Sequence, residues 1–196
     1  MKVATATGRA SSATGWELVM VRPLNVDDFD QLYAAAADPL LWEQHPETER
    51  WREDVFRAYF DDHLASDGAL AVADRATGQL IGASRYDNYD PEGSEVEIGW
   101  TLLARQYWGG TYNADLKRLM LKHAFQSVER VVFLIGASNL RSRQAVEKLG
   151  AIESGTRRGM VLYALHTYLN PMSRHRVSPT SQKRHQMDEN RERSTT

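Results

Sequence analysis

The sequence predicts a mixed α/β fold, in which helices flank a central sheet of mostly antiparallel strands. Several segments place apolar residues at helical spacing, and others are short, apolar and rich in β-branched residues, as is typical of strands. In the second half of the chain, a strand, a loop, a helix, a strand and a further helix follow one another. This order makes the expected sheet a mixed one.

The first half of the chain predicts one strand, two helices and an antiparallel meander. Pro23 closes the first strand, because proline cannot donate to a sheet. Acidic residues stand at the start of the first helix, where they suit the positive end of the helix dipole, and Asp38-Pro39 ends that helix. The expected strands are residues 18–21, 69–73 and 80–86, and the expected helices are residues 27–37 and 51–65.

The second half predicts the alternation of strands and helices. Val96, Ile98 and Trp100 alternate with polar or small residues, as in a strand with one covered face. Asn139 suits an N-cap and Gly150 a helix stop, so they bound the last helix. The other expected elements are a strand over residues 95–102, a helix over 113–125, and strands over 130–135, 151–156 and 160–168. In the helix over 113–125, the apolar face holds Leu116, Leu119, Met120 and Ala124, and Asp115, Lys117, Arg118 and Lys122 lie outside it.

The composition suits one globular domain with a tail at each end. The chain has 196 residues, of which 42% are hydrophobic and 26% charged. We expect residues 1–15 to form a disordered tail and residues 16–172 to form the domain. Residues 173–196 are polar, lack periodicity and carry a charge of +3, so we interpret them as a disordered, basic tail. A weak contact between this tail and an acidic partner is the alternative.

Several classes of protein are excluded by composition. The chain has no cysteine, which rules out disulfides and a cysteine nucleophile and suits a cytoplasmic location. No apolar run approaches the ~20 residues of a membrane helix, and residues 1–15 lack the apolar core of a signal peptide. The six histidines have no metal-ligand spacing, so no metal is expected. The net charge of −2 argues against nucleic acid as a partner.

The most informative segment is the loop over residues 104–113, where adjacent glycines join a strand end to a helix start. Gly109 and Gly110 allow several backbone N–H groups to approach an anion, and the helix N-terminus adds its partial positive charge. The loop therefore predicts a phosphate cradle, with a simple turn of the chain as the alternative. No Lys-Ser/Thr follows Gly110, and the glycine spacing of a dinucleotide fingerprint is missing, which argues against both nucleotide motifs.

Two motifs of the sequence resemble the GNAT superfamily of N-acetyltransferases. The coenzyme A loop of that family reads Gln/Arg-x-x-Gly-x-Gly/Ala, and Gln106, Gly109 and Thr111 stand at its fixed positions, with Thr111 in place of the usual small residue. Residues 139–150 are similar to the family's Asn-x-x-Ser-x-x-x-x-Glu-Lys-Leu-Gly element. The resemblance covers residues 18–168. Within the superfamily, the chain looks like the ribosomal-protein alanine acetyltransferases.

This resemblance implies a GNAT-like acyl-CoA N-acyltransferase fold, whose sheet opens as a V between residues 95–102 and 130–135. It also implies acetyl-CoA as co-substrate, with the pantetheine arm in that opening and the pyrophosphate in the loop over 105–113. The implied cofactor contacts are strand amides near Leu102 and Ala104, then Arg105, Gln106, Gly109, Gly110, Thr111 and Asn113 in the loop, and Asn139, which also suits a helix cap.

The implied chemistry is acetyl transfer to a primary amine, which needs a base, a polarised carbonyl and a proton for the leaving thiolate. The family often places a carboxylate on the strand over 95–102, so we expect Glu97 to be the base, directly or through water. The alternative for Glu97 is a solvated carboxylate on a polar face with Glu95. Ser142 is implied as the acid or thiol-side contact, with a plain helix-surface serine as the alternative.

One position departs from the family. Val146 stands where many relatives carry a proton-donating tyrosine, so that role is unfilled unless Tyr112 or Tyr163 approaches from elsewhere. This departure motivates a second reading, a non-catalytic acyl-CoA-binding or regulatory protein on the same fold. A third reading is nucleic-acid binding through the basic tail, against which the acidic charge of the other residues argues.

The acceptor side is only weakly marked in the sequence. Residues 42–46 lie between the first two helices, where relatives often line the amine cleft, so Trp42 and His45 are candidates for binding the acceptor. The alternatives are core packing for Trp42 and an exposed surface position for His45. The sequence identifies neither the amine nor the oligomeric state, and it is compatible with a homodimer without requiring one.

Overall fold

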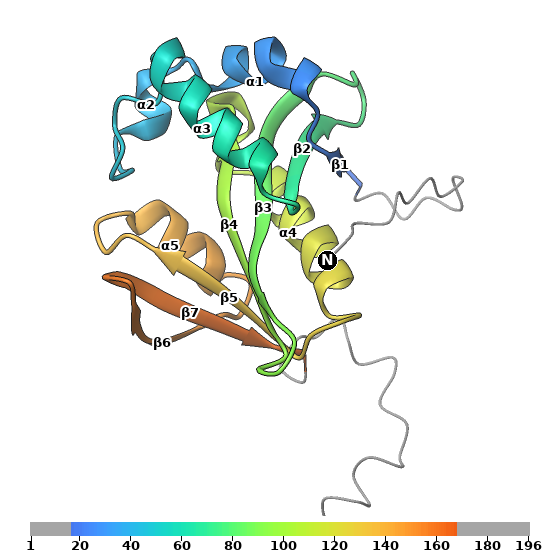
Figure 1. Cartoon of the computed structure of the whole chain (residues 1–196), viewed down its shortest axis with the longest axis vertical. Coiled ribbons are helices and arrows are strands. Elements are labelled where there is room, and N and C mark those ends of the chain that lie inside the picture. Colours follow the sequence, from blue (N-terminus) through green and yellow to red (C-terminus); the bar gives the residue numbers. More distant parts are fainter. Residues whose placement is uncertain (1–16, 168–196) are drawn as a thin grey trace, which may run out of the picture.

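A computed structural model describes residues 17–167, which form a mixed sheet covered by helices on both faces (Figure 1). The strand order is β1-β2-β3-β4-β5-β7-β6, and only β4 and β5 pair in parallel. The expected tails, residues 1–15 and 173–196, lie outside the described residues. The strands are β1 (Val19–Pro23), β2 (Ala69–Asp74), β3 (Leu80–Asp90), β4 (Glu95–Leu103), β5 (Arg130–Ile135), β6 (Ile152–Arg157) and β7 (Met160–His166).

The helices lie close to their expected positions, with one addition. They are α1 (Phe29–Ala36), α2 (Pro39–Trp42), α3 (Glu53–Ala65), α4 (Thr111–Ala124) and α5 (Leu140–Glu147), with 3-10 turns at Val26–Asp28 and Arg105–Tyr107. The short helix α2 was not predicted. Asp38-Pro39 ends α1 as expected, but the Asp38 side chain also accepts a hydrogen bond from the Leu40 amide, so the same dipeptide begins α2. None of the helices in the described part is both long and apolar enough to cross a membrane.

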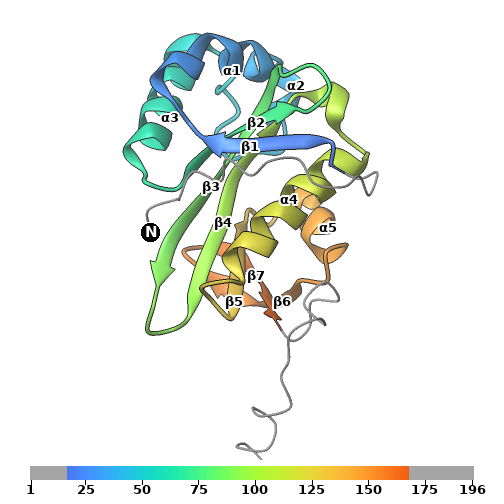
Figure 2. The same ribbon diagram turned by 90° about the vertical axis from the view of Figure 1, so that its right-hand side faces the viewer.

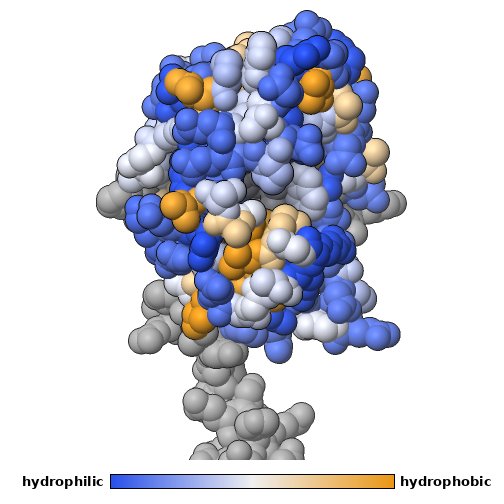
Figure 3. All heavy atoms as spheres, turned by 90° about the vertical axis from the view of Figure 1, so that its left-hand side faces the viewer, coloured by the Kyte–Doolittle hydropathy of each residue, from blue (hydrophilic) through white to orange (hydrophobic). Residues whose placement is uncertain are grey.

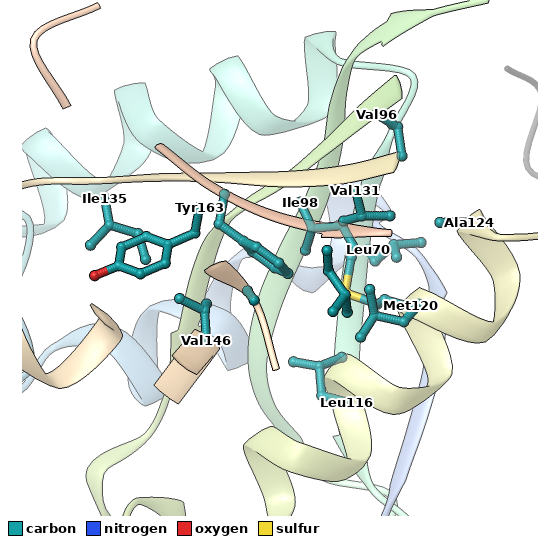
Figure 4. Packing of buried hydrophobic residues seen from close by; sticks show 14 of the residues in the cluster. Leu70, Val96, Ile98, Leu116, Met120, Ala124, Val131, Ile135, Val146 and Tyr163 are labelled. Carbon is teal, nitrogen blue, oxygen red and sulfur yellow. The ribbon is translucent and has the colours of Figure 1, made fainter. Parts of the chain in front are cut away.

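Two apolar clusters hold the layers together, one on each face of the sheet. α4 and α5 cover one face, and α1 and α3 lie toward the other (Figures 1 and 2). The cluster under α4 and α5 joins Ile98, Leu116, Met120, Val131, Val146 and Tyr163 (Figure 4). The cluster under α1 and α3 joins Leu32, Trp42, Phe56, Tyr59, Ala83 and Leu102.

The sheet opens between β4 and β5, as expected. These strands pair only where Glu95, Val96 and Glu97 face residues 130–132. Beyond Glu97, β4 continues beside β3 alone, and β5 continues beside β7 alone. The two strands diverge visibly in Figure 1, where β4 rises toward the helices α1–α3 and β5 runs toward α5. The V-shaped opening predicted from the family resemblance is therefore confirmed.

A bulge in β4 lies at this opening and corrects the expected side-chain alternation. The pairing of β3 with β4 shifts between Ala83 and Arg85, and Trp100 has a φ of 50°, in the left-handed region. We expected Trp100 to share a face with Ile98. Instead Trp100 packs against the cluster under α1 and α3, because the bulge inserts one extra residue and reverses the alternation. The Tyr59 hydroxyl donates to the Trp100 carbonyl at 2.9 Å, and the Arg85 guanidinium lies 3.7 Å from the centre of the Trp100 ring.

Two side chains of α4 also differ from expectation. Asp115 and Lys117 were placed outside the apolar face, but each is 5% exposed. Asp115 is buried because it accepts hydrogen bonds from the amides of Leu18 and Val19, which begin the edge strand β1. Lys117 is buried because its side chain extends toward β4 and reaches Thr101. Helical periodicity alone does not detect such tertiary partners.

Candidate functional site

The loop before α4 presents unpartnered backbone donors. Gly109 has a φ of 69°, a conformation that only glycine adopts without strain, and Gly110 is the N-cap of α4. Among residues 17–167, no side chain accepts a hydrogen bond from the first turn of α4. By contrast, Asn139 caps α5 by accepting from the Ser142 amide at 3.1 Å, so the expected cap is confirmed. An uncapped helix start after paired glycines is a ready site for a phosphate group.

Aromatic side chains fix the shape of this loop. The Trp108 indole N–H donates to the Leu103 carbonyl at 2.8 Å, which fastens the loop to the end of β4. Tyr107 and Tyr112 bracket the glycines, with ring centroids 4.8 Å apart. The guanidinium of Arg141, at the start of α5, lies 3.7 Å from the centre of the Trp108 ring. Arg141 therefore brings a cation to the loop, which sequence reasoning did not predict.

The side chains and amides predicted to contact the cofactor are not equally available. Arg105 forms an ion pair with Asp38, and the hydrogen bond between them holds the pKa of the Asp38 carboxyl below its usual range. The Ala104 amide donates to the Ile81 carbonyl at 2.8 Å. Ala104 was expected to contact the cofactor, but its amide is thus already paired with β3.

The other loop candidates remain accessible. Gln106, Gly109, Gly110 and Thr111 are exposed, and Asn113 is half-buried in the first turn of α4. Leu102 lies farther along β4 with its side chain buried, and its carbonyl is turned toward Gly82 of β3. The accessible candidates thus gather around the uncapped start of α4.

Glu97 lies at the apex of the V, as the last β4 residue that pairs with β5. The residue is 3% exposed, and one carboxylate oxygen accepts a hydrogen bond from the Asn88 side chain at 2.7 Å. Burial raises the pKa of the Glu97 carboxyl, the Asn88 bond opposes that effect, and the charge of Asp87 adds to it. The alternative of a solvated carboxylate was therefore wrong for Glu97.

Glu95 shows how different two carboxylates of one strand can be. It is 9% exposed, and it forms ion pairs with Arg157 at 2.6 Å and with Arg130 at 3.0 Å. Glu95 is thus neutralised by fixed cations, whereas Glu97 is held by a single neutral amide donor. Of the two, only Glu97 has the environment of a general base.

The candidate proton donors of the second half are largely engaged elsewhere. Ser142 is half-buried in the first turn of α5. The Tyr163 hydroxyl donates to Glu147 at 2.7 Å and accepts from Arg143 at 3.0 Å, so it is held in a charged network. Tyr112 packs against Tyr107 in the loop. Val146 is buried in the apolar cluster under α4 and α5, and the hydroxyl of Tyr163 is already engaged, so Tyr163 does not supply the missing proton donor.

The acceptor candidates lie together beside the bulge. Trp42 is 3% exposed and donates from its indole N–H to the Ala36 carbonyl at 2.8 Å, so it packs in the core, as the alternative proposed. His45 is half-buried, its ring lies edge-on to Trp42, and burial lowers the pKa of its imidazole to about 4. Arg50 lies 3.1 Å from His45 and covers the Tyr59 ring at 4.6 Å.

The segment around His45 also approaches the second half of the molecule. Pro46 lies next to Gly136, immediately after β5, and the Gln44 side chain accepts from the Arg141 amide at 3.3 Å. Figure 3 views this side of the molecule and shows a hollow between the helical layer above and the layer of α5 and β5 below. Within residues 17–167, no group of three potential metal ligands occurs.

Comparisons with known proteins agree with this geometry. A sequence model described as "Acetyltransferase (GNAT) domain" matches residues 19–152. Among solved structures, the chain is similar to a GCN5-related N-acetyltransferase from Brucella melitensis, with a TM-score of 0.68, 22% identity and 76% of each chain covered. It is also similar to spermidine N-acetyltransferase from Vibrio cholerae in complex with CoA and spermine, with a TM-score of 0.60, 14% identity, and 78% of this chain and 97% of that chain covered. Mycobacterium smegmatis RimJ in complex with CoA-disulfide gives a TM-score of 0.59 at 16% identity, covering 78% of this chain and 84% of that chain.

Proposed function

Because the chain belongs to the GNAT acetyltransferase family, we propose that it transfers the acetyl group of acetyl-CoA to a primary amine by direct attack, without a covalent enzyme intermediate. The observation that carries this proposal is the opening of the sheet next to an uncapped helix. β4 and β5 part after Glu97, and the free donors of α4 lie at the far end of β4. The free edge of β4 leads to the anion-binding start of α4. This arrangement suits an elongated molecule with a diphosphate at one end.

The residues present fit acetyl-CoA as co-substrate. Gly109, Gly110 and the first turn of α4 would hold the pyrophosphate through backbone N–H groups, and Arg141 would add positive charge. The unpaired length of β4 beyond Glu97 would hold the pantetheine arm. Acetyl-CoA supplies an acetyl group activated as a thioester, and every other part of the reaction falls to the side chains at the apex.

Glu97 is the proposed base. Its raised pKa makes its carboxylate a stronger proton acceptor than that of an exposed glutamate. The amine would enter beside His45 and Arg50, from the side of the bulge where Glu97 and Trp100 lie. His45 lines this approach, and Trp42 supports it from the core.

For the acceptor, which the sequence leaves open between a small molecule and a protein N-terminus, we propose a protein N-terminus, because the chain resembles the ribosomal-protein alanine acetyltransferases. The motif over residues 139–150 supports this reading, and RimJ is among the similar structures. A polyamine is the competing acceptor, since a spermidine acetyltransferase is similar to a comparable degree.

An acceptor screen tests the proposal. The full chain is incubated with acetyl-CoA and, separately, with peptides beginning in alanine or serine, polyamines and amino acids, and mass spectrometry detects a gain of one acetyl group. Release of free thiol above the rate without an amine gives the turnover. Acetylation of one acceptor class supports the proposal. Tight acetyl-CoA binding without turnover on any amine would instead favour a non-catalytic acyl-CoA-binding protein.

A further inference from the structure

Lys117 of α4 is a buried cationic side chain to which the proposed function assigns no role. The residue is 5% exposed, and lysine is among the residues that are least often buried without a charged partner. No carboxylate forms an ion pair with it among residues 17–167. Its position in the fold therefore calls for a specific explanation.

The Lys117 ammonium spans the opening of the sheet. Its Nζ donates to the Thr101 hydroxyl of β4 at 2.5 Å and lies 3.4 Å from the Ser84 hydroxyl of β3. The same Nζ lies 5.8 Å from the ring centre of Phe133, the first β5 residue beyond the segment paired with β4. Lys117 thus lies where the strands separate, between the two arms of the V.

Lys117 and Glu97 approach this point from opposite faces of the sheet. Lys117 reaches it from the face covered by α4, where Val96 and Ile98 are also directed. Glu97 alternates with Val96 and Ile98 along β4, so its side chain is directed to the other face. A proton acceptor and a cationic proton donor therefore flank the place where the sheet opens.

The groups that contact the Lys117 ammonium are uncharged, and no carboxylate among residues 17–167 forms an ion pair with it. From β3 and β4 it meets the hydroxyls of Ser84 and Thr101, and from β5 it meets an aromatic ring. Of the ionisable groups near α4, Asp115 binds Arg118 and the β1 amides, and the Tyr86 hydroxyl donates to the Met120 carbonyl. Burial lowers the pKa of the Lys117 ammonium to about 7, which makes it a better acid than an exposed lysine.

We propose that Lys117, acting through the Thr101 hydroxyl, supplies the proton that the coenzyme A thiolate takes up as it leaves. The assignment rests on the proposed acetyl transfer. The amine nitrogen bonds to the acetyl carbon, the carbon–sulfur bond breaks with its electron pair going to sulfur, and the amine proton passes to Glu97. The sulfur takes the Thr101 proton, which a Lys117 proton replaces, and both Lys117 and Glu97 then exchange protons with water. Thr101 is exposed, whereas Lys117 is buried, so the hydroxyl is the group that would meet the sulfur.

The first test measures the protonation of Lys117 directly and requires no turnover. In protein labelled with ¹³C at lysine Cε, the Lys117 resonance is identified by its loss in Lys117→Met. We expect it to titrate near pH 7, about 3 pH units below the usual pKa of a lysine. Titration near pH 10 would overturn the proposal, because the ammonium would then be too weak an acid to differ from any other lysine.

The second test uses kinetics with matched variants, on an amine accepted by the wild-type chain. Lys117→Met and Thr101→Val should each lower kcat about 100-fold, with little change in the KM for the amine, and together no more than either alone. Thr101→Ser, which keeps the hydroxyl, should restore most of the rate, and Lys122→Met on the exposed face of α4 should behave as wild type. Wild-type kcat should fall as the pH rises through the Lys117 pKa, and Lys117→Met should lack this alkaline limb.

The outcomes separate this role from the proposed function. A wild-type chain that acetylates no amine would remove the proposed function and this role with it. A wild-type chain that turns over, with Lys117→Met or Thr101→Val at the wild-type rate, would overturn only the role of Lys117. If Lys117→Met fails to fold, Thr101→Val still decides the question, because residue 101 is exposed and its replacement disturbs the core less.

Discussion

Replacing Glu97 by glutamine should make the protein slower and more stable at the same time. Glutamine has nearly the same shape, and its carbonyl oxygen can still accept the hydrogen bond from Asn88. What it removes is the ability to take a proton and the charge that burial disfavours. The perturbation is therefore confined to protonation, with the packing at the apex of the V retained.

The expected magnitudes follow from that environment. A positioned general base contributes roughly 10²- to 10⁴-fold to a rate, so kcat should fall by that factor, about 3–5 kcal/mol in the activation barrier. Because the pKa of Glu97 is raised in the folded state, its ionisation opposes folding once the pH exceeds the pKa of an unfolded glutamate. Glu97→Gln should therefore unfold at a higher denaturant concentration than the wild type at pH 7, and the difference should vanish as the pH falls to about 4.

Two measurements on the same samples provide the assay. Free thiol release gives kcat over a pH series, where wild-type kcat should rise with pH through the raised pKa of Glu97. Urea unfolding gives the free energy of unfolding. Glu95→Gln is the matched control, because Glu95 lies on the same strand but is paired with Arg130 and Arg157. It should lose about 1 kcal/mol of stability, given that both arginines are partly exposed, and retain most of its rate.

One combination of results would refute this reasoning. If Glu97→Gln kept wild-type turnover across the pH series, Glu97 would not be the base. If it were less stable at pH 7 than at pH 4, relative to wild type, the buried carboxylate would be stabilised by contacts beyond the Asn88 bond. A loss of acetyl-CoA affinity would also count against the assignment, since Glu97 lies away from the phosphate cradle.

Three further predictions concern the scaffold of the site. Asn139→Ala should lower the free energy of unfolding by about 1 kcal/mol, because it removes the cap of α5, and Asn139→Asp should restore it in urea unfolding. Gly109→Ala should weaken acetyl-CoA binding in calorimetry and destabilise the loop by roughly 1–2 kcal/mol, because its φ of 69° strains a side chain, whereas Gly109→Asn should be milder. Tyr59→Phe should lower the free energy of unfolding by about 1 kcal/mol, because it removes the hydrogen bond to the Trp100 carbonyl. If that bond shapes the bulge, the activation barrier for kcat should rise by more than the stability falls. An equal change in both free energies would show only a packing role.

The course of the chain was largely predictable from local patterns. Periodicity and end signals placed the strands and the longer helices, because each is read within a few neighbouring residues. The cap at Asn139 is of this kind. The short helix α2 was not predicted, because Asp38-Pro39 both ends α1 and begins α2. A helix of four residues is also too short to show a helical period of apolar residues.

The site was less predictable, because its chemistry depends on contacts between distant segments. The environment of Glu97 differs from that of Glu95 through partners on β3, β5 and β6, not through anything within β4. Lys117 looked like one more solvated lysine of an amphipathic helix, and only the fold brings Thr101 to it. The bulge at Trp100 likewise arises from a shift in the pairing of β4 with β3, which the alternation of apolar and polar residues along β4 does not predict.

The opening of the sheet gives it two edges in its interior. Beyond Glu97, the backbone of β4 and the facing backbone of β5 each lack a strand neighbour on one side, within a sheet that is otherwise continuous. Exposed edges of this kind invite pairing with other chains, but here the segment at Pro46 lies next to Gly136, immediately after β5. The pantetheine arm of the proposed acetyl-CoA carries amide groups along its length, so it would find unpaired backbone partners along these two edges.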